Sequence, residues 1–231
     1  YSLGHPVMRT MWSEFPNDAH TFTLQSQWLI GSALLVVPVV DPGKTSVQAY
    51  LPPGMRWFHL DTLKEEAACD GQGDDGGRVT LQAPMDHIPV LARGGSIVPR
   101  KMRLRRSSKL MFYDPYTLIV APDANDEATG QLYLDDEASL AHETKGKFAL
   151  RQFSYRRGVL NCSGSGDYAP PNVVERVVIA GMAKVPKRVV LSQANVASVD
   201  LVFFHDAANK VVTLKKPDVR ADQDWTITFD F

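Results

Sequence analysis

The sequence has few cysteines, almost no net charge and no long hydrophobic run. Two cysteines among 231 residues give no disulfide framework to read from their spacing. A net charge of −1 offers no general attraction to nucleic acid or anionic membrane. The apolar stretch at residues 36–40 is interrupted by Pro38 and falls far short of the roughly 20 residues that span a bilayer. We therefore expect a globular protein with no nucleic-acid partner and no membrane span.

Recognisable metal and cofactor motifs are also lacking. The six histidines have no metal-ligand spacing and so predict no metal site of their own. Residues 71–76 match the letters G-x-G-x-x-G, but no strand precedes them and no helix follows. The aspartates Asp70, Asp74 and Asp75 would also repel a pyrophosphate. The sequence thus predicts no cofactor.

The chain begins without an initiator methionine or a signal peptide, and we interpret it as a processed, nicked or separately produced fragment. Asn161-Cys162-Ser163 fits the N-glycosylation pattern and predicts a glycan on Asn161, which would imply a secretory compartment. Whether Cys69 and Cys162 pair is left open by their spacing.

From residue 34 onward, short runs rich in Val, Ile, Tyr, Phe and Thr alternate with Gly, Pro, Asn and Asp. Many short strands with such punctuation favour β-sandwiches. Before them, we expect a strand at residues 7–12 and a helix at 21–30, capped by Asp18 and ended by Gly31. Gly94-Gly95 predicts a tight turn between strands, with one glycine at positive φ. The polar residues 100–109 are the best domain boundary.

Asp135-Asp136-Glu137 is the tempting carboxylate cluster. A retaining glycosidase needs two carboxyl groups about 5–5.5 Å apart on either side of one bond. Adjacent strand residues point to opposite faces, so this pair cannot easily flank a sugar. We expect an acidic turn whose side chains bind backbone amides, with a calcium site near Asp135 as the minor alternative.

Several strings resemble glycoside hydrolase family 31, in the family's order. Residues 88–99, IPVLARGGSIVP, followed by the Arg-Arg-Ser-Ser string at 105–108, are the most specific. The others lie at residues 4–16, 27–39, 50–57, 114–118, 132–139 and 174–179. In the string at 132–139, Glu137-Ala138 replaces the family's usual Gly-Glu. The resemblance covers nearly the whole chain. Among the members of the family, it is greatest to the catalytic α subunit of a member found in the endoplasmic reticulum.

The resemblance implies a mainly β fold in three parts. Residues 1–33 would end a catalytic (β/α)8 barrel, residues 34–109 would form a proximal β-sandwich, and residues 110–231 a distal one. Both catalytic aspartates would lie upstream, leaving no catalytic residue in this chain. Arg9, Trp12 and Glu14 would lie at the substrate-pocket rim, where barrel strands end, or pack behind the pocket.

The resemblance also implies an activity and partners. The whole protein would be a retaining α-glucosidase that removes α-linked glucose from N-glycans of nascent glycoproteins in the endoplasmic reticulum lumen, without a cofactor. This segment would complete and buttress the barrel and would be inactive alone. Its partners would be the upstream part of the same α subunit, a non-catalytic β subunit and the N-glycan substrate.

Two other classes of function stay open from the residues. A free-standing carbohydrate-binding β module would need solvent-facing aromatic side chains, for which Trp57, Phe58 and Trp225 are the candidates. A polyanion-binding module would use the basic residues of 100–109, although a solvated or ion-paired linker is the simpler interpretation.

Overall fold

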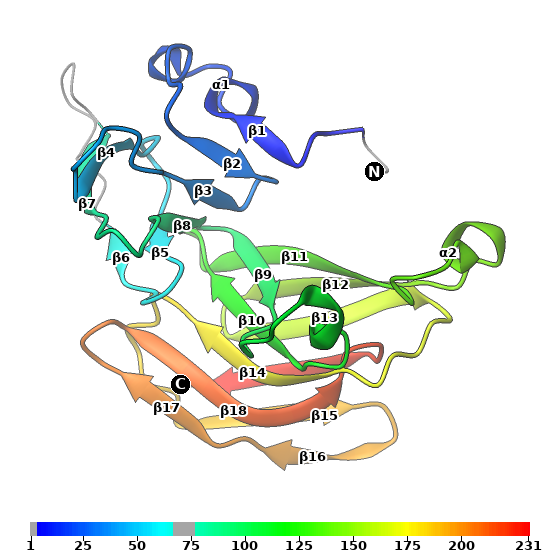
Figure 1. Ribbon diagram of the computed structural model, residues 1–231. Helices are drawn as coiled ribbons and strands as arrows, with labels where there is room; N and C mark the ends of the chain where they lie inside the picture. Colours follow the sequence, from blue (N-terminus) through cyan, green and yellow to red (C-terminus); the bar gives the residue numbers. More distant parts are fainter. Residues whose placement is uncertain (1–3, 67–76) are drawn as a thin grey trace. The chain divides into compact units, whose positions relative to one another are not determined.

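The computed structural model describes residues 4–66 and 77–231 and divides into two compact units, Tyr1–Gly94 and Gly95–Phe231 (Figure 1). Both units are built mainly from strands, which confirms the mainly β prediction. Cys69 and the glycine pattern at 71–76 lie outside the described residues. No helix in the described part of the chain is long and apolar enough to cross a membrane.

The first unit contains a six-stranded antiparallel sheet and a two-stranded one. The six strands, in spatial order, are β1 (Met8–Thr10), β2 (Trp28–Ile30), β3 (Leu34–Val36), β8 (Val90–Arg93), β5 (Trp57–His59) and β6 (Glu65–Glu66). Strands β4 (Ser46–Tyr50) and β7 (Arg78–Gln82) form the second sheet. The helical elements are α1 (Met11–Glu14) and the 3-10 turn η1 (Ala19–Thr21). The core gathers side chains from both sheets and α1: Met11, Phe15, Leu29, Leu35, Val37, Ala49, Leu51, Trp57, Val79, Leu81 and Leu91.

A buried amide ties the two sheets of the first unit together. The Gln27 side chain donates to the Tyr50 carbonyl and accepts from the Tyr50 amide, both at 2.8 Å. Gln27 is almost fully buried, so these two bonds satisfy polar groups that water cannot reach. The clamp fixes the start of β2 beside the end of β4.

The predicted helix at residues 21–30 is wrong. Asp18 does cap a helical segment, since its carboxylate accepts from the His20 amide at 3.1 Å, but that segment is only the 3-10 turn η1. Trp28–Ile30 instead forms β2 and pairs with both β1 and β3. Strand pairing on both sides and the Gln27 clamp outweigh the local helix signal. Trp12, predicted to end a strand, lies in α1.

The second unit is one eleven-stranded curled sheet. Its spatial order is β16 (Val196–Asp200), β15 (Arg188–Gln193), β19 (Trp225–Asp230), β13 (Val159–Gly166), β12 (Ala149–Arg156), β11 (Glu127–Leu134), β9 (Ser96–Arg100), β10 (Tyr116–Ala121), β14 (Val173–Ile179), β18 (Val211–Arg220) and β17 (Phe203–Asp206). The short helical elements are η2 (Ser108–Met111) and α2 (Ala141–Thr144). Alternate strand residues, among them Phe153, Tyr155 and Trp225, face one continuous core.

The two outermost strands of this sheet are consecutive in the chain. Only Leu201 and Val202 separate β16 at one edge from β17 at the other. The Leu201 amide donates to the Val189 carbonyl of β15, and the Val202 carbonyl accepts from the Lys215 amide of β18. Two residues reach less than about 11 Å between neighbouring strands, so the opposite edges must meet. The sheet therefore closes around its own core.

The boundary between the compact units differs from the expected one. We predicted it within residues 100–109, but β9 pairs with β10 over Ser96–Arg100 and so belongs to the second unit. The chain passes between units at Gly94-Gly95 because the strands on either side, β8 and β9, join different sheets. The separation of residues 1–33 from the proximal part remains a prediction.

Gly94-Gly95 forms the expected turn, and Gly95 has the expected positive φ of 92°. The Gly94 amide donates to the Arg56 carbonyl in the first unit, at 2.7 Å. The Gly95 amide donates to the Ala121 carbonyl in the second unit, also at 2.7 Å. The backbone of each glycine is thus fixed within its own unit.

We predict that Gly95→Val destabilises the chain by about 1–3 kcal/mol. A Cβ at this position would meet only the Asp123 Cβ, at 3.7 Å, so the cost is conformational strain and not a clash. Gly95→Asn should cost less, because asparagine tolerates positive φ better than valine. Urea unfolding of the three proteins measures the difference, and equal midpoints for Val and Gly would contradict the role of the turn.

Candidate functional site

Arg9 and Glu14, two of the predicted rim residues, form an ion pair in the first unit. Arg9 Nη1 lies 2.5 Å from Glu14 Oε1, and Arg9 Nε donates to the Pro6 carbonyl at 2.9 Å. The second Glu14 oxygen lies 3.7 Å from Arg93 Nη1. The Arg93 guanidinium in turn stands 4.8 Å from the centroid of the Phe15 ring. One carboxylate therefore holds two guanidinium groups that come from different strands.

The Arg93 contact was not singled out from the sequence. Burial lowers the pKa of Arg93, and the Glu14 carboxylate opposes that shift. The two residues are 79 positions apart in the chain, and no local spacing signals such a contact. Only the sheet pairing that places β8 against β3 explains it.

Trp12, the third predicted rim residue, is half exposed, whereas Met11 and Phe15 on either side of it enter the core. Other apolar side chains of the same unit are exposed as well: Val7, Met8, Phe22 and Ile30. Strand β1, which ends two residues before Trp12, is the outermost strand of its sheet. We call Val7, Met8, Trp12, Phe22 and Ile30 the exposed apolar set.

The acidic turn after β11 caps backbone amides, as predicted. Asp135 Oδ1 accepts from the Glu137 amide at 2.8 Å. Asp136 accepts from the Ala138 and Ser139 amides, at 3.1 and 2.9 Å, and from the Ser139 hydroxyl at 2.6 Å. These bonds lower the pKa of Asp136 to about 2, the Ser139 hydroxyl having the largest effect. No three His, Cys, Asp or Glu side chains within the described residues gather closely enough to hold a metal ion.

The basic residues of 100–109 make specific contacts. Arg105 binds the buried Asp114 carboxylate through two nitrogens, at 2.6 and 3.0 Å. Arg103 pairs with Glu175 at 3.0 Å. Lys101 donates to the Phe112 carbonyl at 3.1 Å. These engaged cations favour the ion-paired linker over a polyanion-binding surface.

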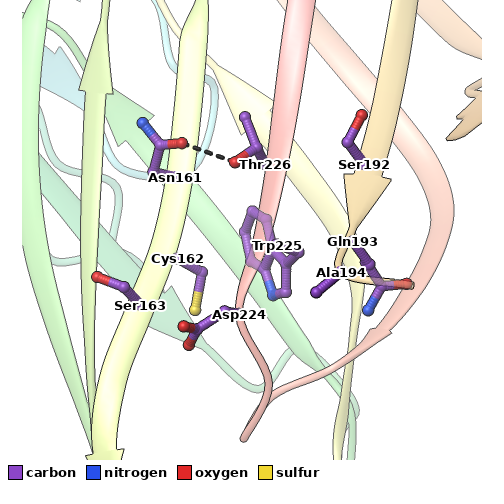
Figure 2. A pocket seen from close by; sticks show the side chains of 9 residues that line it. All are labelled: Asn161, Cys162, Ser163, Ser192, Gln193, Ala194, Asp224, Trp225 and Thr226. Carbon is purple, nitrogen blue, oxygen red and sulfur yellow. Dashed lines mark hydrogen bonds between the residues drawn. The ribbon is translucent and has the colours of Figure 1, made fainter. Parts of the chain in front are cut away.

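Asn161 lies on β13 beside an open pocket of about 490 Å³ (Figure 2). Its side-chain oxygen accepts from the Thr226 hydroxyl at 2.8 Å, and Ser192 and Gln193 of β15 line the other side of the pocket. This bond leaves the amide nitrogen, the atom that a glycan would join, as a donor. Glycosylation of Asn161 stays a prediction.

Cys162, the neighbour of Asn161, has a buried side chain, and burial is the main cause of the raised pKa of its thiol. Arg151 Nη2 lies 3.7 Å from the Cys162 sulfur and also donates to the Asp224 carboxylate. The largely buried arginine is therefore held from two sides. Whether Cys162 pairs with Cys69 is untested, because Cys69 lies outside the described residues.

The proposed aromatic platform of a free-standing carbohydrate module is wrong. Trp57 and Phe58 have no exposed surface, and Trp225 has 2%. Trp57 and Trp225 belong to the cores of their units. Phe58 follows Trp57 on β5 and therefore points to the opposite face of the sheet, where it is equally buried. They stabilise the fold and present no face to a sugar.

The fold and the motif order match the β-rich C-terminal region of glycoside hydrolases. Residues 4–98 match the model of the glycosyl hydrolase family 31 C-terminal domain. The chain is 40% identical to human neutral alpha-glucosidase AB over 230 residues, which is 97% of this chain and 23% of that protein. It is 36% identical to the probable glucan 1,3-alpha-glucosidase of Arabidopsis thaliana, over 97% of this chain and 25% of that protein. The chain belongs to glycoside hydrolase family 31.

Solved structures agree with this assignment. The catalytic subunit in the heterodimeric complex of endoplasmic-reticulum glucosidase II with the binding domain of its regulatory subunit matches with a TM-score of 0.87 and 28% identity, over 98% of this chain and 26% of that one. The glucosidase II alpha subunit in its DNJ-bound form matches with a TM-score of 0.86 and 27% identity, over 98% and 26%. The chain thus spans about a quarter of the relatives that it matches.

Because the folded pKa of Asp136 is depressed, its carboxylate contributes stability that is present above its unfolded pKa of about 4. That contribution is lost as the pH falls from about 4 toward 2. We expect Asp136→Asn to be less stable than the native chain at pH 6, with a difference that shrinks over this window. Thermal melts across the pH range measure it. Asp86→Asn, at an exposed position, is the control, and a difference that stays constant with pH would contradict the assignment.

Proposed function

We propose that this chain is the C-terminal portion of a retaining α-glucosidase that trims α-linked glucose from N-glycans in the endoplasmic reticulum lumen, as a glucosidase II α subunit would. Family membership, the α-glucosidase names of the relatives and the glucosidase II structures support the class of enzyme. No residue of this chain is assigned a catalytic step. The two aspartates that act as nucleophile and general acid/base lie on the upstream part.

The exposed apolar set is the observation that carries this proposal. Val7 and Met8 are 74% and 66% exposed, and Met8 begins β1, which is the outermost strand of its sheet in the part of the chain that the structure describes. Burying one large apolar side chain stabilises a fold by about 1.5–3 kcal/mol, so a surface of this kind favours a covering partner. The upstream part of the same subunit is that partner for Val7, Met8, Phe22 and Ile30, and it leaves Trp12 facing the pocket. The segment thereby completes and buttresses the catalytic barrel.

Trp12 is the side chain that we assign to the pocket rim. The Arg9–Glu14 ion pair joins β1 to the last residue of α1 and so fixes the short helical turn that carries Trp12. Arg93 holds Glu14 from the neighbouring part of the sheet. A half-exposed indole on a fixed turn is suited to stack on a sugar ring. Arg9 and Glu14 act as positioning residues for it.

The proposal includes a non-catalytic β subunit as a partner. Its support is the solved glucosidase II complex, in which a catalytic subunit is bound to the binding domain of a regulatory subunit. The N-glycosylation pattern at Asn161 agrees with the proposed lumenal location. The N-glycan itself is the substrate, and no cofactor enters the reaction.

The isolated 231-residue chain should not hydrolyse a chromogenic α-glucoside, because neither proposed catalytic aspartate is present. The assay compares the purified chain with the full-length protein at equal molar concentration. Turnover by the purified chain, above that of a buffer blank, would overturn the assignment of the catalytic residues to the upstream part.

In the full-length protein, Trp12→Ala should raise KM about fivefold with a smaller loss of kcat, because stacking on a sugar contributes on the order of 1 kcal/mol. Phe204→Ala removes an exposed aromatic ring of the second unit and is the matched control, which should leave KM unchanged. Steady-state kinetics and a melting curve are measured on each protein. A lowered melting temperature with native kinetics for Trp12→Ala would place Trp12 behind the pocket.

A further inference from the structure

Three neighbouring strands of the second unit end around a small pocket of about 190 Å³. Strand β9 lies between β10, antiparallel to it, and β11, parallel to it. The end of β9, the beginning of β10 and the end of β11 therefore lie next to one another at the same end of the sheet. These three ends supply Lys101, Tyr116 and the acidic turn to the pocket. Its volume corresponds to about six waters at ~30 Å³ each, which suits one small ring-shaped ligand.

The donor side of the pocket is the Lys101 ammonium. It donates to the Phe112 carbonyl at 3.1 Å and stands 5.0 and 6.0 Å from the ring centroids of Tyr116 and Phe112. These contacts hold the cation in place against two aromatic faces. An ammonium has three N–H donors, and one is used here, so two remain for a ligand.

The acceptor side is formed by two carboxylates of the acidic turn. Asp135 uses Oδ1 for the Glu137 amide, and its Oδ2 lies 3.7 Å from His142 Nδ1. Glu137 is exposed and also lines the pocket. Burial, and after it the charge of Glu137, raises the pKa of Tyr116 to about 12, which agrees with a carboxylate near that phenol.

The backbone of Glu137 is strained in a way that serves this placement. Its φ is +52°, in the left-handed region that non-glycine residues rarely occupy. A glycine would adopt this conformation at lower cost but would carry no carboxylate. Strain of this kind, of order 1–3 kcal/mol, is concentrated at ligand sites.

The set of groups selects the class of ligand. One ammonium and two carboxylates leave the lining negative, which disfavours phosphates and other anions. The charges also disfavour a purely apolar ligand, because they would lose water without compensation. Within the described residues no group of three potential ligands could hold a metal ion. A neutral molecule with several hydroxyls satisfies donor and acceptors together.

Aromatic rings supply the remaining wall. Tyr133 is half exposed at the pocket and stacks on Phe148, with ring centroids 5.8 Å apart and an interplanar angle of 17°. The stacked partner limits rotation of the Tyr133 ring. A pyranose has both an apolar ring face and outward hydroxyls, so it matches aromatic walls that lie beside fixed polar groups.

We propose that this pocket is a non-catalytic binding site for a single neutral hexopyranose unit, with Lys101 donating to and Glu137 accepting from its hydroxyls. The site is separate from the proposed hydrolysis, because none of its residues takes part in the proposed rim. Its occupation would hold a glycan, or a free sugar, on the second unit.

The first experiment measures the acetylation rate of Lys101 by mass spectrometry in the full-length protein. The probes are the methyl α-glycosides of glucose, mannose and galactose, titrated to about 100 mM because single sugars bind with millimolar constants. At least one of them should slow Lys101 acetylation fivefold or more. Lys109, on the nearby η2, should be unaffected, and ethylene glycol controls for solvent effects. No change at Lys101 with any of the three glycosides would overturn the proposal.

Glu137→Gln is the decisive variant, and Glu143→Gln on α2 is its matched control. Glu137→Gln should raise the dissociation constant of the glycoside that protects Lys101 at least tenfold, whereas Glu143→Gln should leave that constant at the native value. Hydrogen exchange of the 127–139 peptide gives a second readout that does not depend on lysine reactivity, and melting curves verify that both variants fold. If the glycoside protects Lys101 of Glu137→Gln as strongly as it protects the native protein, the proposed contact between Glu137 and a sugar hydroxyl is wrong. Because binding here is read at Lys101 and not by turnover, a protein without α-glucosidase activity would still test it.

Discussion

The closure of the eleven-stranded sheet is the constraint on which the second unit depends. Two residues, Leu201 and Val202, connect the outermost strands, and their backbone groups bond to β15 on one side and β18 on the other. An open sheet with these strands at its edges would need a far longer connection. Closure also explains the core, in which side chains from strands as distant in the chain as β9 and β19 pack together. Burial of the apolar residues that the closed sheet surrounds then stabilises its curled shape.

The same strand order generates the polar features of the unit. Parallel pairing of β11 with β9 and antiparallel pairing of β9 with β10 bring the acidic turn, Lys101 and Tyr116 to one end of the sheet. In the first unit, the pairing of β3 with β8 has a similar effect, because it places Arg93 within reach of Glu14. In both cases charged side chains are brought to the same place because backbone ladders fix the strands that carry them, and in the first unit the Arg93–Glu14 contact follows from that placement.

The sequence was informative where structure is decided locally. The Gly94-Gly95 turn, the capping role of Asp18 and the amide-binding aspartates of the acidic turn depend on neighbouring residues alone, and each could be predicted. The helix at residues 21–30 was mistaken because pairing with β1 and β3, which lie outside any local window, determines the conformation of Trp28–Ile30. The Arg93–Glu14 contact and the pocket beside Lys101 could not be predicted for the same reason. The resemblance in motifs supplied the family, and it could not supply these contacts.

The position of β19 has a consequence for synthesis of the protein. Trp225–Asp230 is the last of the eleven strands to leave the ribosome, yet it lies between β13 and β15 in the interior of the sheet. Until it is inserted, two long strands present unpaired backbone groups, and the ring of strands cannot be complete. Such edges recruit other chains and favour aggregation. The nascent second unit must therefore remain open, and dependent on protection from its surroundings, until the very end of its own translation.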